Sequence, residues 1–205
     1  MKLDRLTRSR VERMTAELVA EFEDVFAPGS VALVVEDTVA RMGEITVTRF
    51  VPLLVERFAR DRLLAAAQAD GLINKYVPNV LFICSANAGR SQMAAAITNH
   101  VSQAVYARSA GSDPAGHIDL AVIEAMAELG IDMAFEYPKP ITDEIVRAAD
   151  VVVTMGCNDA CPVIPGPRYR DWHIDDPAGR DLDDVRRIRL DISNHILDLL
   201  KELLP

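Results

Sequence analysis

The chain has few cysteines, a deficit of positive charge and no long apolar run. It holds 205 residues with three cysteines, and 31 acidic residues outnumber 22 Lys and Arg, which gives a net charge of −9. An odd number of cysteines does not fit a secreted disulfide scaffold and favours a reducing cytoplasm. The acidic balance argues against nucleic acid as a partner, because phosphate backbones bind cationic surfaces. No apolar stretch approaches membrane-spanning length and none follows Met1–Arg5, so we expect neither a membrane segment nor a signal peptide.

Residues 1 to about 74 are predicted to be helical throughout, because apolar residues recur at helical spacing in three stretches. A break at Ala27-Pro28-Gly29-Ser30 separates the first two helices, and Ser30 is expected to cap the second. The third helix, about 48–69, carries Pro52 in its first turn, where proline is tolerated. Three amphipathic helices with short connections predict a small antiparallel bundle over 1–74, followed by a linker at 74–78.

Three arginines cluster on the predicted third helix, Arg57, Arg60 and Arg62. Charged residues on a helix usually form its solvated face, and we interpret this cluster in that way. The alternative is a site for an anion or a partner protein.

From Val77 onward, strands and helices alternate. Apolar segments predict strands at 80–84, 105–109, 151–155 and 169–173. Helices are expected at 90–101, 119–129, 142–149 and 181–204. The alternation predicts an α/β domain over 79–205, with a four-stranded parallel sheet flanked by helices. Ligands bind beyond the carboxyl ends of the strands in such sheets, so the segments after Cys84, Met155 and His173 should meet at one site.

The most informative stretch is Cys84–Ser91, which reads Cys-Ser-Ala-Asn-Ala-Gly-Arg-Ser. It follows an apolar run and precedes a helix-forming run, so a buried strand should end in a tight loop that leads straight into a helix. Such a loop turns backbone N–H groups inward and the helix dipole adds partial positive charge, which makes a cradle for a tetrahedral oxyanion. The same field stabilises a thiolate, and we interpret Cys84 as an activated nucleophile. The alternative is a cysteine that ends a strand by chance.

Each part of this loop has a separate physical task. The predicted oxyanion ligands are Ser85, Ala86, Asn87, Ala88, Gly89 and Arg90. Arg90 offers a planar fork of donors suited to bidentate contact with oxyanion oxygens. Gly89 is expected to allow a backbone conformation that other residues resist, and Asn87 tolerates the left-handed region and can hydrogen-bond locally. Ser91 can donate its hydroxyl to the Cys84 sulfur.

Two further cysteines, Cys157 and Cys161, follow the predicted strand 151–155. In one helical turn their Cα atoms would lie ~6 Å apart, within the range of a disulfide. Pro162 disfavours helix at Cys161, so a loop that can bend is the better interpretation. A zinc half-site and two unrelated buried thiols are the alternatives, but no second Cys pair is visible. A reactive Cys84 nearby favours redox pairing, and we expect no metal.

A carboxylate is expected at the carboxyl end of the last strand, in Asp175-Asp176-Pro177. At that position Asp176 could protonate a leaving oxygen as a general acid. The alternative is an aspartate that caps a turn before proline. The predicted cradle favours the catalytic interpretation.

Together these residues resemble the low-molecular-weight protein tyrosine phosphatase fold and, within it, the thioredoxin-coupled arsenate reductases. The resemblance covers residues 79 to about 203 and rests on several motifs in order. They are Val80–Ala94, Ser109–Ser112, Ala125–Asp132, Pro138–Thr142, Val152–Cys157 and Asp175–Pro177. The helical segment 1–74 is similar to an N-terminal bundle that some members carry.

The resemblance implies a mechanism and partners. Cys84 would attack arsenate held by the loop, with Asp176 as acid. Cys157 would then attack Cys84 and release arsenite, and Cys161 would take over the disulfide, which thioredoxin reduces. Phosphate would compete with arsenate, and no cofactor is implied. Some members bind potassium through a carboxylate in the helix after the loop, whereas this chain has Met93–Ala96 there, so no such site is expected.

Two other functions stay open. Phosphatases of this fold resemble Cys-x-Gly-Asn-x-Cys-Arg-Ser, where this chain has Ala86 and Gly89, and they usually carry aromatics where Ala178-Gly179 follows Asp-Pro. Weak phosphatase activity is nevertheless compatible with the cradle. A non-catalytic sensor that binds arsenite or a metal through the three thiols, with the bundle as its output module, is a candidate of another class.

Overall fold

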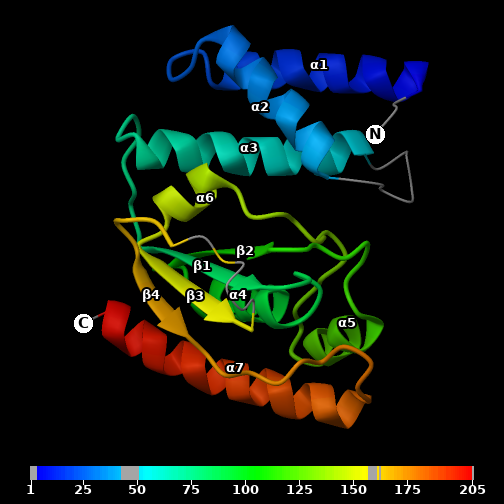
Figure 1. The fold of residues 1–205 in the computed structure, drawn as a ribbon, viewed down its shortest axis with the longest axis vertical. Coiled ribbons are helices and arrows are strands. Elements are labelled where there is room, and N and C mark those ends of the chain that lie inside the picture. The colour runs from blue at the N-terminus through cyan, green and yellow to red at the C-terminus, as the bar shows by residue number, and fades with distance from the viewer. Residues whose placement is uncertain (1–3, 43–50, 157–160, 162, 205) are drawn as a thin grey trace. The chain divides into compact units, whose positions relative to one another are not determined.

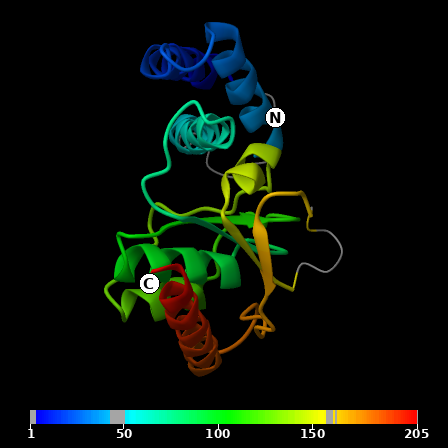
Figure 2. The same cartoon turned by 90° about the vertical axis from the view of Figure 1, so that its left-hand side faces the viewer.

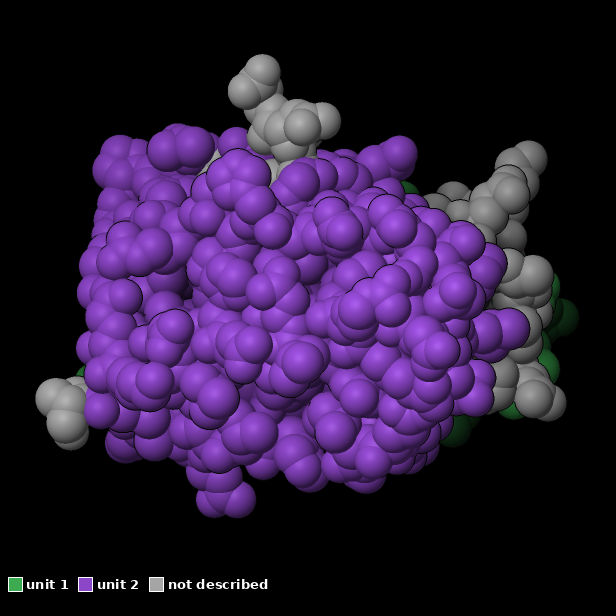
Figure 3. Space-filling model, turned by 90° about the horizontal axis from the view of Figure 1, so that it is seen from below, with its two compact units in different colours: residues 1–74, 142–148 green, residues 75–141, 149–205 purple. Residues whose placement is uncertain are grey.

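The computed structural model describes residues 4–42, 51–156, 161 and 163–204. The chain divides into two compact units, coloured separately in Figure 3. One unit comprises residues 1–74 and 142–148, and the other comprises residues 75–141 and 149–205. The first unit therefore combines the N-terminal segment with a short segment from the second half of the chain, and we describe each unit by itself.

The first unit consists of helices. Its elements are α1 (Arg5–Glu21), α2 (Pro28–Arg41), α3 (Val51–Ala69) and α6 (Asp143–Ala148). The side chain of Asp4 caps α1 by accepting a 2.7 Å hydrogen bond from the backbone N–H of Thr7. Apolar residues of α1, α2 and α3, among them the fully buried Leu18, Val31 and Val55, form one core. The periodicity of the sequence predicted these three helices correctly.

The expected cap of α2 is wrong. The helix begins at Pro28, its N-cap is Ala27 in an extended conformation, and no side chain caps it. Ser30 lies inside the first turn, where its backbone N–H donates to the carbonyl of Ala27 at 2.9 Å. Proline at the first helical position sets the helical φ in advance, so the helix begins two residues before Ser30.

The interpretation of Arg62 as part of a solvated face is also wrong. Its side chain is only 6 % exposed and forms ion pairs with Asp37, at 2.7 Å, and with Glu144. It also donates a 2.8 Å hydrogen bond to the Thr38 hydroxyl. The charge of Arg62 suggested a solvated face, because the sequence alone cannot show that Asp37 and Glu144, far apart in sequence, both meet this guanidinium. Arg60, by contrast, is partly exposed and pairs with Glu21 at 3.0 Å.

The second unit is built on a four-stranded parallel sheet. Its strands are β1 (Asn79–Cys84), β2 (Tyr106–Gly111), β3 (Val151–Met155) and β4 (Arg168–Asp171). Their spatial order is β2-β1-β3-β4, and the central strand β1 places Cys84 beside Gly111 and Met155. The predicted fold class is confirmed. The chain order crosses over between β2 and β3, so the carboxyl ends of β1 and β3 lie next to each other.

Three helices of this unit, α4 (Arg90–Val101), α5 (Leu120–Ala127) and α7 (Leu182–Leu203), cover one face of the sheet, as Figures 1 and 2 show. They enclose a core with alternate residues of β1 and β3, including Phe82 and Val153. Trp172, just after β4, packs on Phe82 with 5.6 Å between ring centroids. No helix of the described residues is long and apolar enough to cross a membrane.

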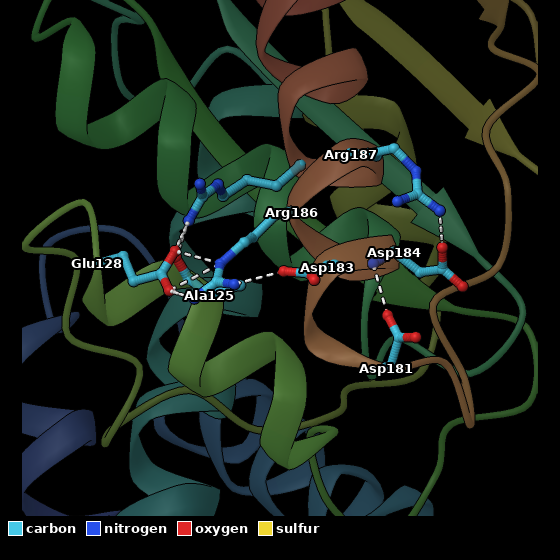
Figure 4. A network of polar contacts seen from close by, with 8 residues as sticks. Ala125, Glu128, Asp181, Asp183, Asp184, Arg186 and Arg187 are labelled. Carbon is cyan, nitrogen blue, oxygen red and sulfur yellow. Dashed lines mark hydrogen bonds and ion pairs between the residues drawn. The ribbon is translucent and has the colours of Figure 1, made fainter.

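A polar network joins α5 to α7 (Figure 4). The carboxylate of Glu128, at the end of α5, accepts hydrogen bonds from the guanidinium groups of Arg186 and Arg189 on α7. Arg186 also reaches Asp183 within its own helix. Hydrogen bonds from Arg186 first, and then from Arg189, lower the pKa of Glu128 to about 2. The network therefore fastens α5 to α7. The N-cap of α5, Asp119, in turn donates its backbone N–H to the Ala88 carbonyl of the Cys84 loop.

Candidate active site

The loop between β1 and α4 turns its carbonyl groups outward. The carbonyls of Cys84, Ser85, Ala86 and Ala88 accept hydrogen bonds of 2.9–3.2 Å from the backbone N–H groups of Ser112, Asp113, Ala115 and Asp119. In a trans peptide, a carbonyl and the next N–H point in opposite directions. The N–H groups of residues 85, 86, 87 and 89 therefore turn inward. The loop has the polarity of an oxyanion cradle, at the amino end of α4.

Asn87 holds this loop in shape. Its backbone has a φ of 46°, in the left-handed region that asparagine tolerates. Its side chain is fully buried, and its Oδ1 accepts from Gln92 Nε2 at 3.0 Å and from the Lys139 backbone N–H at 2.8 Å. Its Nδ2 donates to Ser91 Oγ at 2.8 Å. Both ends of the amide are thus satisfied, which fixes the direction in which it donates.

The thiol of Cys84 lies at the end of β1 and is 2 % exposed. Its sulfur is 3.0 Å from Ser91 Oγ. Since the Ser91 oxygen already accepts a hydrogen bond from Asn87, its proton is available to the sulfur. A chain of contacts from Asn87 through Ser91 therefore ends on the sulfur.

Arg90 extends along the other side of the loop and is 8 % exposed. Its Nη1 donates to the carbonyl of Ile174 at 3.4 Å, and its Nη2 donates to Asp176 Oδ2 at 2.6 Å. Both partners come from the segment after β4. The side chain of Asp176 is 57 % exposed, so a carboxyl group stands at the rim of the site within reach of solvent. The structure brings together the Cys84 loop and Asp176, which are far apart in sequence.

Glycine at position 89 is explained by a contact with a distant segment. Gly89 has a φ of −142°, outside the left-handed region. A Cβ at this position would lie 2.4 Å from Cγ of Pro177. The residue after Asp176 thus packs directly on the loop. Sequence reasoning could not find this because the contact joins two distant segments.

The segment that follows β3 contacts the Cys84 loop. Ser85 Oγ donates a 2.7 Å hydrogen bond to the carbonyl of Gly156, which joins the loop to the end of β3. Cys157 lies outside the described residues. Cys161 is disulfide-bonded, whereas Cys84 carries a free thiol. A cavity of about 950 Å³ lies beside Cys161 and is lined by residues that include Gly156, Val163 and Trp172.

Sequence reasoning missed Gln92 as a residue of the site. Its Nε2 donates both to Asn87 and to the carbonyl of Tyr137 at 2.8 Å, and its side chain is buried. A polar residue directly after the Arg-Ser pair, at the start of an otherwise apolar helix, is the signal that could have found it. Among the residues that the structure describes, no group of three or more His, Cys, Asp or Glu could hold a metal ion.

This arrangement defines a class of α/β proteins in which a strand-end cysteine faces an oxyanion held by a loop and a helix terminus. Residues 79–204 match the model of the low molecular weight phosphotyrosine protein phosphatase family, and residues 11–67 match that of the protein-tyrosine-phosphatase-like N-terminal domain. The chain belongs to the low molecular weight phosphotyrosine protein phosphatase family.

Proteins similar to this chain include arsenate reductases. The chain is 38 % identical over 120 residues to arsenate reductase 1 of Staphylococcus epidermidis, covering 55 % of this chain and 88 % of that protein. The solved structure of the Corynebacterium glutamicum thioredoxin-dependent arsenate reductase is 38 % identical with a TM-score of 0.85, over 94 % of this chain and 96 % of that one. A structure described as an arsenate reductase in the phosphate binding state is 25 % identical with a TM-score of 0.54, over 62 % and 99 % of the two chains.

Proposed function

We propose that this protein is an oxidoreductase that reduces arsenate to arsenite and is regenerated by thioredoxin. The observation that carries the proposal is the free thiol of Cys84 beside an inward-facing amide cradle, with Arg90 on its other side and a disulfide at Cys161. A phosphatase needs the thiol in its cradle and the arginine, but it does not need a disulfide at Cys161. The similarity to arsenate reductases supports the same conclusion.

The first step of the proposed reaction is substitution at arsenic. The Cys84 thiolate forms a bond to As(V), and a hydroxyl group of arsenate takes one proton from Asp176, the general acid, and leaves as water. The inward amides and the Arg90 guanidinium stabilise the oxyanion throughout this step. Phosphate has the same tetrahedral shape and charge and would compete for the cradle.

The second step transfers electrons through sulfur. Cys157 attacks the Cys84 sulfur, so an S–S bond forms as the S–As bond breaks, and the electron pair of the broken bond reduces As(V) to arsenite. Cys161 then attacks Cys157, which frees Cys84 as a thiolate. This sequence ends with Cys84 as a free thiol and a disulfide between Cys157 and Cys161. The dithiol of thioredoxin reduces that disulfide and completes the cycle.

We further propose that residues 79–205 form the catalytic domain and residues 1–74 an accessory domain, in a cytoplasmic protein that serves arsenic detoxification. The odd number of cysteines and the need for a thioredoxin system support that compartment.

Turnover with defined reductants tests the proposal. The pure protein is given arsenate, thioredoxin, thioredoxin reductase and NADPH, and NADPH oxidation is followed. Hydrolysis of a phosphotyrosine analogue is measured in parallel. We expect arsenate-dependent NADPH oxidation that Cys84→Ser abolishes. Hydrolysis without reduction would identify a phosphatase, and stoichiometric binding of arsenite to the three thiols without turnover would identify a sensor.

A further inference from the structure

Gly156 lies directly against the guanidinium group of Arg90. Its φ is +67°, a backbone conformation that L side chains rarely adopt. A Cβ at this position would lie 2.6 Å from Arg90 Nη1, 3.5 Å from Cζ and 3.8 Å from Nη2. Ordinary contact between such atoms is about 3.5 Å or more. A side chain at position 156 and the present place of the guanidinium therefore exclude each other.

Two hydrogen bonds also hold the guanidinium from the segment after β4. The carbonyl of Ile174 and the carboxylate of Asp176 accept from Nη1 and Nη2. Gly156 is itself tied to the cradle, because its carbonyl accepts the 2.7 Å hydrogen bond from Ser85 Oγ. The position of Arg90 over the loop is thus set by Gly156 on one side and by the segment after β4 on the other.

We propose that Gly156 is a positioning residue of the oxyanion site: because it has no side chain, it determines where the Arg90 guanidinium stands over the cradle, and hence the affinity for a tetrahedral oxyanion. The inference rests on the proposed function only in taking Arg90 as an oxyanion ligand. A methyl group at 156 would displace the guanidinium by roughly 1 Å. A misplacement of that size can weaken a site's interaction with its ligand by about 100-fold when its groups must match the position of the bound oxyanion.

A matched pair of glycine variants separates this role from backbone strain. Gly130, after α5, has a φ of +73° and no atom within 4 Å of a Cβ built on it. Gly156→Ala and Gly130→Ala therefore share the cost of a side chain at positive φ, and only the first meets Arg90. Phosphate binding to the reduced protein is measured by calorimetry, and the melting temperature is measured for each variant.

We expect the melting temperature to fall by a similar amount in both variants. Only Gly156→Ala should weaken phosphate binding, by about 10- to 100-fold. In the Arg90→Ala background, Gly156→Ala should add no further loss, because the two changes act through the same group. Wild-type phosphate affinity in Gly156→Ala, or the same loss in the Arg90→Ala background, would overturn the inference.

A second variant serves if Gly156→Ala does not fold. Ser85→Ala removes the tether to the Gly156 carbonyl, and phosphate affinity should fall several-fold in the wild-type background and not in the Arg90→Ala background. Unchanged affinity would again overturn the inference. Failure of the wild-type protein to bind phosphate or arsenate would instead refute the proposed function.

Discussion

Removing the Ser91 hydroxyl tests how the site activates its thiol. In the structure this oxygen is 3.0 Å from the Cys84 sulfur and accepts from Asn87 Nδ2 at 2.8 Å. Ser91→Ala deletes the donor that faces the sulfur and leaves the cradle amides and Arg90 in place. The variant therefore isolates one hydrogen bond to the thiolate.

The size of the effect follows from the kind of bond that is lost. A hydrogen bond to a charged group contributes roughly 1.5–3 kcal/mol. Since 1.4 kcal/mol corresponds to a factor of about 10, the reactivity of Cys84 should fall by up to about 10- to 100-fold. Alkylation by iodoacetamide requires the thiolate, so its rate at Cys84 should fall by the same factor near neutral pH.

The assay is alkylation of the reduced protein, followed by mass spectrometry of the peptide that contains Cys84. Thr98→Val is the matched control. It removes a buried hydroxyl from the same helix, where Thr98 Oγ1 donates to the Ala94 carbonyl at 2.8 Å rather than to the site. Ser91→Ala should alkylate slowly, and Thr98→Val should alkylate like the wild type. Equal rates for Ser91→Ala and the wild type would refute the role of this hydroxyl.

Three further outcomes are expected. Arg90→Lys should weaken phosphate and arsenate binding by about 10-fold or more, because a point charge cannot replace a planar fork; unchanged phosphate inhibition would place the anion elsewhere. Cys161→Ser should complete one arsenate turnover and stop with a Cys84–Cys157 disulfide, seen by peptide mapping, and a Cys84–Cys161 bond in the wild type would reverse the order of attack. Glu128, whose pKa of about 2 in the folded protein is below its ordinary 4.5, should stabilise the fold above about pH 4.5 and lose that contribution as the pH falls towards 2. Glu128→Gln should therefore show a weaker dependence of melting temperature on pH in that range, and identical profiles would contradict the assignment.

The sequence by itself determined the elements that depend on local chemistry. An apolar run, a loop of small residues and a helix-forming run predicted the order of β1, loop and α4, and the structure has α4 at Arg90–Val101 as expected. Alternation of strands and helices predicted the parallel sheet. Cys84 and Arg90 could be placed at the same site for the same reason, since both belong to one short strand–loop–helix unit.

Only the tertiary structure decided what depends on contacts between distant segments. Gln92 joins the site because its amide meets Asn87 and the carbonyl of Tyr137. Arg62 is buried because Asp37 and Glu144 converge on it, whereas its charge alone suggested a solvated face. Periodicity describes which side of one element a residue occupies, and it contains no information about what a second element brings to that side.

The glycines show the same division most clearly. The sequence marked Gly89 as a position that needs glycine, and the tertiary structure supplied a reason, the close approach of Pro177 to where a Cβ would lie. Gly156 gave no signal in the sequence beyond its place at a strand end. Its importance arises because folding brings Arg90 to within 2.6 Å of where its side chain would begin. The role of a glycine can be assigned only when the neighbouring group that occupies the place of its missing side chain is known.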